Sequence, residues 1–330
     1  MVKEDFAFIS PDSHQKLSLI EKDRTKKLIS DSGIEYKFIH NFPDLTYPAT
    51  LELKEKNTLE FYENRADVYD KFLYQTFKTH NENESEIRNK FIDKLNINSN
   101  SKVLEIACGT GRDSEIIAKR LGPNGEIVLQ DISPSMLNIC FQKLLHVDDV
   151  KKVFCISNAA YLPFPDNYFD ATYSFGGLGE FPEIKKSLKE MVRVTKVGGK
   201  IVVGDESMPP WLRHTYFSKV LSKTNPQFLA DVPLKDIPVE ARKVTLQWVI
   251  GGVFYLIDFE VGDGEPNGNF DYEIEGAKGG TLRTRFEGEL EGVTKETKEL
   301  AYLAAKAKGI SMHNWLDSLV KEAAKKDLGL

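Results

Sequence analysis

The sequence predicts an α/β fold built on a doubly wound, mostly parallel sheet. From Ser101 to Gly204, short apolar runs alternate with helical stretches, which is the pattern of a parallel sheet covered by helices. The first of these runs leads directly into a turn of small residues that opens a helix. Sheets of this kind bind ligands beyond the carboxyl ends of their strands, so we expect the functional site there.

The elements of this core follow one another in order. The strands are expected at 103–107, 126–130, 153–157, 169–174 and 200–204, and the helices at 113–121, 134–145 and 182–195. Residues 1–95 are predicted to be mostly helical and to form a lid, with a loop around residues 41–48. Within 59–73 the side chains at i, i+4, i+7 and i+11 share one helical face, namely Tyr62, Ala66, Tyr69 and Leu73.

Charge divides the chain unevenly. From Asp258 to Glu275 every charged residue is acidic, and glycines, a proline and asparagines are interspersed, which indicates a linker. We therefore predict four parts: the helical N-terminal region 1–95, an α/β core 96–261, an acidic linker 262–279 and a small tail 280–330.

Composition excludes several classes of protein. The chain has 330 residues, a formal net charge of -6 and three cysteines. The length suggests about two domains, and the odd number of cysteines indicates a reducing, cytoplasmic compartment rather than a disulfide framework. Apolar runs are too short to span a membrane, and the N-terminus lacks the apolar core of a signal peptide. No CxxC or HExxH motif occurs, so we expect no metal site.

The sharpest feature is the turn after the first core strand. Gly109 and Gly111 leave room for a ligand to approach the backbone, because they carry no side chain. Asp131 ends the next strand, at a spacing that suits a carboxylate accepting hydrogen bonds from ribose hydroxyls. The third glycine of a dinucleotide fingerprint is replaced by Ser114, and no phosphate-binding P-loop is present. A plain βα turn with structural glycines is the alternative.

Four motifs in the right order resemble class I S-adenosylmethionine-dependent methyltransferases, and among them the ubiquinone/menaquinone C-methyltransferase-like small-molecule group. They are EIACGTG at 105–111, LQDISPSM at 129–136, LPFPDNYFD at 162–170 and EMVRVTKVGGKIVVG at 190–204. The resemblance covers roughly residues 60–260. It implies S-adenosyl-L-methionine as cofactor, a small-molecule methyl acceptor, and a last antiparallel strand that begins near Gly251.

The resemblance also implies roles for individual residues. Those expected around the methionine moiety and the ribose are Glu105, Ala107, Gly109, Gly111 and Asp131, and those around the adenine are Ile132, Met136, Asn158 and Ala159. Asn158 stands where relatives commonly have an acid, and its carbonyl oxygen could accept a hydrogen bond from the adenine amine. Phe175 would lie beside the methyl sulfonium, or be a plain core aromatic. Tyr62 belongs to a segment that covers the cofactor in relatives, and Tyr69 could also close over it.

Methyl transfer needs a base only when the acceptor must lose a proton. Glu180 is the first candidate for this base or for substrate contact, and a solvated charge at a helix start is the alternative reading. Asp205 and Glu206 follow the last core strand and are predicted at the same rim. Either could contact substrate.

The tail resembles the ribbon-helix-helix fold of Arc-type and HicB-type proteins. Residues 281–286 alternate with period two, as in a strand, and two helices follow around Gly309 and Ser311. The resemblance implies a homo-oligomer formed through the tail. DNA binding through Arg283 and Arg285 is disfavoured by the acids that follow them, and an unrelated helical hairpin is a third reading. Docking of a protein partner is an alternative to dimerisation. The rival to an enzyme is an S-adenosylmethionine-binding regulatory protein that uses this tail to bind DNA or a protein partner.

Overall fold

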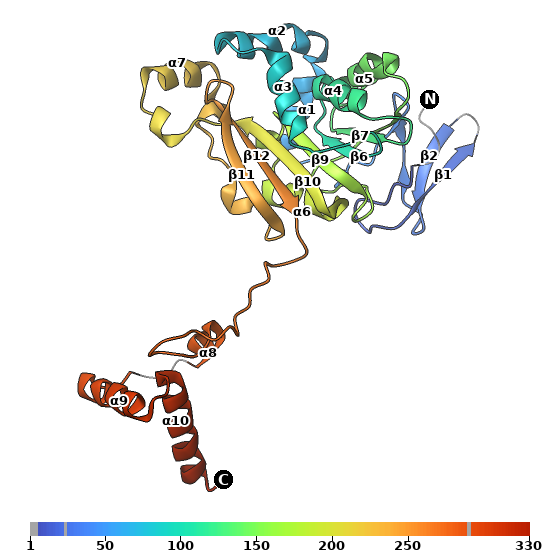
Figure 1. Cartoon of the computed structure of the whole chain (residues 1–330). Coiled ribbons are helices and arrows are strands. Elements are labelled where there is room, and N and C mark those ends of the chain that lie inside the picture. Colours follow the sequence, from blue (N-terminus) through green and yellow to red (C-terminus); the bar gives the residue numbers. More distant parts are fainter. Residues whose placement is uncertain (1–5, 23–24, 289–291) are drawn as a thin grey trace. The chain divides into compact units, whose positions relative to one another are not determined.

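The computed structural model describes residues 6–22, 25–288 and 292–330. It divides into two compact units, Met1–Glu265 and Pro266–Leu330 (Figure 1). No helix in the described ranges is both long and apolar enough to cross a bilayer.

A seven-stranded sheet forms the centre of the first unit and confirms the predicted α/β fold. Its strand order is β11-β12-β10-β9-β6-β7-β8, in which β12 runs antiparallel to both neighbours and the other neighbouring pairs are parallel. The bounds are β6 Lys102–Ile106, β7 Glu126–Asp131, β8 Lys151–Ile156, β9 Phe169–Phe175, β10 Thr195–Glu206, β11 Ala241–Val249 and β12 Phe254–Val261. The chain leaves β6 toward β7 and returns to β9 on its other side, so the strand order reverses at β6.

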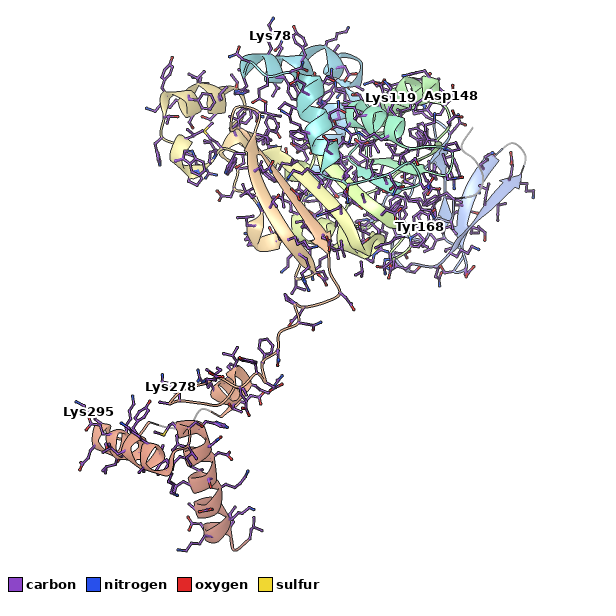
Figure 2. The ribbon with its side chains drawn as sticks, in the orientation of Figure 1. Lys78, Lys119, Asp148, Tyr168, Lys278 and Lys295 are labelled. Atoms are coloured by element: carbon purple, nitrogen blue, oxygen red, sulfur yellow. The ribbon has the colours of Figure 1, made fainter. Side chains whose placement is uncertain are left out.

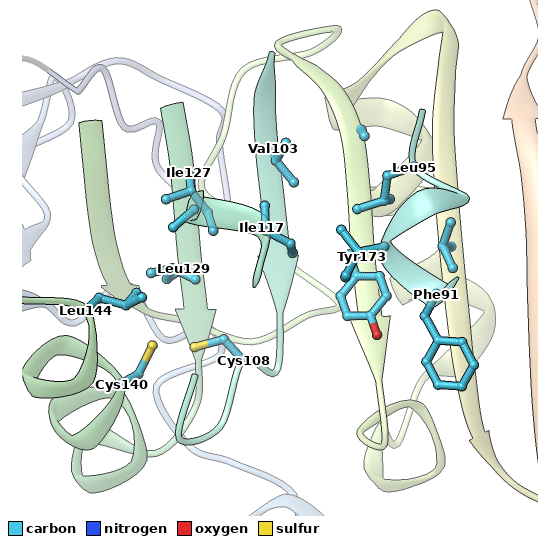
Figure 3. Close-up of a cluster of buried hydrophobic side chains, with 14 of the residues drawn as sticks. Phe91, Leu95, Val103, Cys108, Ile117, Ile127, Leu129, Cys140, Leu144 and Tyr173 are labelled. Carbon is cyan, nitrogen blue, oxygen red and sulfur yellow. The ribbon is translucent and has the colours of Figure 1, made fainter. Parts of the chain in front are cut away.

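Helices cover this sheet because its strands are apolar on both faces. In β7, Ile127 and Leu129 face one cluster with α3 (Glu84–Asp93), α4 (Arg112–Arg120) and α5 (Pro134–Lys143), as Figure 3 shows. Val128, between them, faces the other cluster with α6 (Ile184–Val194). Each such aliphatic side chain contributes about 1.5–3 kcal/mol of burial free energy. The helices predicted at 113–121, 134–145 and 182–195 are confirmed within a few residues.

The prediction that residues 1–95 are mostly helical is wrong for their first half. That half forms β1 (Leu17–Lys22), β2 (Thr25–Ser30) and β3 (Glu35–Tyr36), followed by β4 (Phe38–Ile39) and β5 (Phe42–Pro43). Gly33 has φ +87° in the turn between β2 and β3, a conformation that favours glycine. Buried side chains from this segment, including Leu17 and Leu28, join the cluster that contains α6. Long-range burial against the sheet therefore overrides local helix propensity.

The single helix predicted over 59–73 is interrupted. α1 (Leu53–Glu63) ends at Asn64, and α2 (Ala66–Thr79) begins two residues later. At the break, the carboxylate of Glu63, the last residue of α1, accepts hydrogen bonds from Ser135 N (3.0 Å) and from the hydroxyls of Ser133 and Ser135 at the start of α5. This contact fixes the end of α1 on α5, while Tyr62 and Tyr69 still lie close, with ring centroids 5.9 Å apart.

The described residues of the second unit form three helices: α8 (Leu282–Glu287), α9 (Lys295–Lys308) and α10 (Met312–Leu328). The strand predicted at 281–286 is therefore wrong. The ribbon-helix-helix interpretation lacks the strand that it requires. Thr281 caps α8 by accepting from Thr284 N (3.1 Å), and Thr284 Oγ1 accepts from Thr281 N (2.9 Å). This reciprocal cap satisfies two amides and favours a helix over a strand. The two predicted tail helices are confirmed.

The predicted linker 262–279 is only partly a linker. Phe270 O accepts from Arg283 N (3.0 Å), and Ala277 O accepts from Met312 N (2.9 Å), so its second half packs with the helices of the C-terminal unit. Figure 2 marks this unit with Lys278 and Lys295.

Between β10 and β11 lies a further helical insertion. It contains α7 (Tyr216–Thr224) and short 3₁₀ helices of at most four residues, one of which is Pro226–Leu229. Another short 3₁₀ turn, Leu178–Glu180, follows β9. These two turns meet at the carboxyl ends of the strands, where the site is built.

Candidate active site

A cavity opens at the carboxyl ends of the parallel strands, under α1 and α2. The space between its lining residues, open solvent at the mouth included, is about 1320 Å³. Of the site residues predicted from the sequence, Gly111 and Asp205 do not line the cavity. Those that do include Tyr62, Glu105, Ala107, Gly109, Asp131, Ile132, Met136, Asn158, Ala159, Phe175 and Glu180.

The turn after β6 holds a strained backbone at the cavity wall. Ala107 and Gly109 have φ of +54° and +52°, and a positive φ is uncommon for alanine. Gln130, which the sequence reasoning missed, fixes this turn: its side-chain oxygen accepts from Ala107 N (3.2 Å), and its backbone oxygen accepts from Cys108 N (3.0 Å). Its amide also donates to Ser157 O, so one side chain joins two loops of the site.

Gly111 corrects one prediction. It is not among the cavity-lining residues; instead it is the N-cap of α4, with φ +80°. A Cβ at this position would lie 2.5 Å from Cys140 Sγ on α5. The missing side chain therefore allows close helix packing, and only the other small residues of the motif face the ligand space.

Asp131 is held at the end of β7 by backbone donors. One carboxylate oxygen accepts from Gly109 N (2.7 Å) and the other from Ser133 N (2.9 Å). Burial raises its pKa to about 6, although these hydrogen bonds act to lower it. Each oxygen keeps a lone pair for a ligand hydroxyl, as the predicted contact with a ribose requires.

Glu105 presents a buried carboxyl group to the same space. Its Oε2 atom has no hydrogen-bond partner among the described residues. Burial, and then the nearby Asp113, raise the pKa of Glu105 well above its ordinary value. A cationic ligand group would offset this cost, because an unpaired buried carboxylate is unfavourable.

Apolar side chains surround the predicted adenine position. Met136 and Ala159 are buried and Ile132 is half-buried, and all three line the cavity. Asn158 has partners within the chain: its side-chain oxygen accepts from Ala160 N (2.9 Å), and its amide donates to Glu55 Oε1 on α1 (2.5 Å). Nothing in the sequence around Glu55 indicates that it reaches this site.

A network of ion pairs fastens the lid helices to the core. Asp70 on α2 accepts from Thr110 Oγ1 (2.6 Å), Arg112 Nε (3.0 Å) and Lys143 Nζ (2.9 Å). Burial raises the pKa of Asp70, but these hydrogen bonds outweigh it and lower that pKa to about 2. The carboxylate therefore joins α2 to the glycine-rich turn, α4 and α5, and holds the lid over the cavity.

The three acidic residues at the rim differ in their surroundings. Glu180 is held by two donors, Thr58 Oγ1 on α1 (3.0 Å) and Gln227 Nε2 in the insertion (2.7 Å). Asp205 does not line the cavity; its oxygens accept from Glu206 N (2.8 Å) and Gly179 N. Glu206 does line it, and burial together with Asp205 raises the pKa of Glu206 well above its ordinary value. Asp205 thus positions the loop, while the raised pKa of Glu206 favours the protonated form of its carboxyl group.

Phe175 is both a packing residue and a wall residue. Its ring stacks on Phe254 with centroids 5.6 Å apart and contacts Phe91 at 4.7 Å. A Cβ at Gly204 would come within 2.8 Å of this ring, so that glycine leaves space for it. The ring also lines the cavity, as the prediction for a residue beside the methyl group requires.

The residues present fit S-adenosylmethionine. The unpartnered Glu105 carboxyl suits the ammonium of the methionine moiety, Asp131 suits the ribose, and the Ile132–Met136–Ala159 slot suits a flat base. The glycine-rich turn brings backbone amides to the same wall. Cavity, donors and acceptors thus form one continuous site.

Comparisons with known proteins agree with this site. The model of the ubiE/COQ5 methyltransferase family matches residues 51–227. The demethylmenaquinone methyltransferase of Anoxybacillus flavithermus is 32% identical over 168 residues, which cover 50% of this chain and 69% of that protein. The ubiquinone/menaquinone biosynthesis C-methyltransferase UbiE of Pasteurella multocida is 39% identical over 119 residues, 36% of this chain and 44% of that protein. The chain thus spans less than half the length of the latter.

A solved SAM-dependent methyltransferase from Aquifex aeolicus aligns with a TM-score of 0.40 at 19% identity, over 53% of this chain and 89% of that one. The family model and the Anoxybacillus relative carry the assignment. The chain belongs to the ubiE/COQ5 methyltransferase family and is a class I S-adenosylmethionine-dependent methyltransferase.

Proposed function

We propose that this protein methylates a ring carbon of a small hydroxylated aromatic acceptor, with Glu180 taking the hydroxyl proton. The observation that carries the proposal is the Glu180 carboxylate, held in the cavity wall by Thr58 and Gln227. Relatives named as C-methyltransferases of ubiquinone and menaquinone biosynthesis support an acceptor of this class.

The walls around Glu180 suit a flat ring. The large apolar side chains that line the same cavity include Phe77, Phe175, Phe181, Ile250 and Phe254, and Tyr62 and Tyr69 line it as well. Aromatic rings pack well against one another in such a pocket. A ring with hydroxyl groups would bury its faces here and still reach a carboxylate with its edge.

The chain supplies positioning and proton transfer. When bound, S-adenosylmethionine supplies an electrophilic methyl group on a positively charged sulfur. Glu180 accepts the proton of the acceptor hydroxyl, which raises the electron density at the neighbouring ring carbon. That carbon takes the methyl group from sulfur and then loses its own proton to solvent, and the oxygen takes back the proton that Glu180 holds. Glu206 lines the same cavity, and its raised pKa favours a protonated carboxyl group, which can donate a hydrogen bond toward the oxygen that becomes negative. Holding the two reactants in one closed cavity supplies much of the remaining rate.

Glu180→Gln is expected to lower kcat about 100-fold or more with little change in cofactor affinity, because an amide keeps the two hydrogen bonds but cannot take a proton. Labelled-methyl transfer into quinol-type acceptors measures the rate, and calorimetry measures cofactor binding. Glu183→Gln, an exposed acid three residues on, is the matched control. An unchanged kcat in Glu180→Gln would show that the acceptor needs no base.

We also propose that the C-terminal unit joins two copies of the chain. Ala305 is the only buried apolar side chain among the described residues of this unit, whereas Leu300, Leu303, Leu316 and Leu319 are 42–64% exposed. A unit of this size rarely holds together on such a small core. A second copy presents the same leucine faces, so the two can cover one another.

Leu319→Asp is expected to convert a dimer of the full chain into a monomer, because a charge would be buried at the joint apolar surface. Sedimentation at micromolar concentration gives the mass. Lys321→Asp, on the opposite side of α10, is the control and should stay dimeric. A wild-type chain that sediments as a monomer would contradict the proposal.

A further inference from the structure

We infer that Glu55, on the lid helix α1, recognises the exocyclic amine of the donor's adenine. This role extends the proposed site, since it rests on the adenine lying in the Ile132–Met136–Ala159 slot. It makes a residue of the N-terminal lid responsible for selecting the nucleobase.

The first step is that Asn158 is committed to other partners. Its side-chain oxygen accepts from Ala160 N (2.9 Å), which fixes the orientation of the amide. Its Nδ2 then points at Glu55 Oε1, 2.5 Å away. The side-chain oxygen of Asn158 is therefore directed at the backbone of its own loop, and its amide nitrogen is directed at α1.

The second step is that Glu55 provides an acceptor at the same place. It is only 5% exposed, whereas the other residues of α1 are exposed or half-buried, and it lines the cavity. Oε2 accepts from Glu52 N (2.9 Å), and Oε1 accepts from Asn158. A carboxylate offers about four lone-pair sites, so this group can accept further hydrogen bonds.

The third step is the position of Glu55 along the cavity. Asp131 ends β7, and Asn158 follows the neighbouring edge strand β8, so the Glu55–Asn158 pair lies at the β7–β8 end of the sheet edge, while Lys54 and Thr58 on the same helix bond the loop that carries Glu180. The apolar slot occupies the same β7–β8 end. A base placed there would direct its polar edge at a carboxylate and an amide.

These contacts predict a specific preference. The amine of adenine donates a hydrogen bond that Glu55 accepts, whereas hypoxanthine presents a carbonyl oxygen at the same position. Two acceptors facing one another in a buried site lose a charge-assisted hydrogen bond and repel. The wild-type site is therefore expected to discriminate between two ligands that differ in this group alone.

The test compares S-adenosyl-L-homocysteine with S-inosyl-L-homocysteine by calorimetry. Wild type is expected to prefer the adenine compound by about 100-fold, and Glu55→Gln to reduce this preference at least about tenfold, because a glutamine amide can donate to the carbonyl. The glutamine oxygen can keep the capping contact with Glu52 N at the start of α1, but its amide then faces the donor Nδ2 of Asn158. A lower melting temperature is therefore expected, and the preference is taken as the ratio of the two affinities within each variant. Glu60→Gln, exposed on the same helix, is the control and should keep the wild-type preference.

Two results would overturn the inference. Equal affinity of wild type for both compounds would show that the amine is not recognised, whatever the variants do. An unchanged preference in Glu55→Gln would leave Glu55 as a helix cap only. Asp131→Ala separates these outcomes from failure of the site itself: if that variant still binds the adenine compound like wild type, the placement of the donor is wrong.

Discussion

Replacing Asp131 by alanine is expected to weaken S-adenosylmethionine binding by about 100-fold or more. The carboxylate would accept the ribose hydroxyls and already organises the glycine-rich turn through Gly109 N and Ser133 N. Each charge-assisted hydrogen bond is worth about 1.5–3 kcal/mol, and the substitution also leaves two backbone donors without their acceptor. Calorimetry measures the loss, and Asp148→Ala, an exposed acid, is the control.

The pH dependence of binding gives a second readout of the same residue. Because burial raises the pKa of Asp131 to about 6, binding to the ionised carboxylate should weaken about tenfold per unit as pH falls below about 6. For the folding stability of the unliganded protein, the pH dependence has the opposite sign. The folded chain holds this proton more tightly than the unfolded one, so the stabilising contribution is present below pH 3.8 and is lost as pH rises through about 6. Affinity that is equal at pH 5 and pH 8 would contradict the role of Asp131.

Arg88→Met is expected to destabilise the first unit by about 3–5 kcal/mol, because it leaves a buried acid without its partner. Arg88 on α3 donates to Asp113 Oδ2 (2.8 Å) and to Glu84 Oε1 (2.8 Å), and Tyr173 Oη donates to the same oxygen of Asp113 (3.1 Å). For a unit of this size the melting temperature should fall by about 10 °C. Thermal unfolding followed by circular dichroism measures the change.

Two further variants separate this effect from general loss of an arginine. Arg120→Met removes a largely exposed pair with Asp93 and should cost about 1 kcal/mol or less. The double variant Arg88→Met/Asp113→Leu removes both charges and should be more stable than Arg88→Met alone. A melting temperature of Arg88→Met close to that of wild type would show that Asp113 finds another partner.

Local pattern was sufficient for the central sheet and for most of the site. Strands buried on both faces leave continuous apolar runs, and the turn after β6 needs small residues at positive φ, so both are visible in the sequence. Parallel strands end at one edge, which is why Glu105, Asp131 and Phe175 come together as predicted. Gly111 was placed in the cavity by its motif, because a motif does not distinguish ligand contact from helix packing.

The sequence by itself therefore determined the fold class, the glycine-rich turn and the carboxylate at the end of β7, since each depends on residues close together in the chain. The tertiary structure alone decided the rest. In the folded chain Glu55 contacts Asn158, and Glu206 rather than Asp205 lines the cavity. The residues before α1 form strands. These outcomes depend on partners far apart in the sequence, and burial against such partners outweighs the small free energies of local propensity.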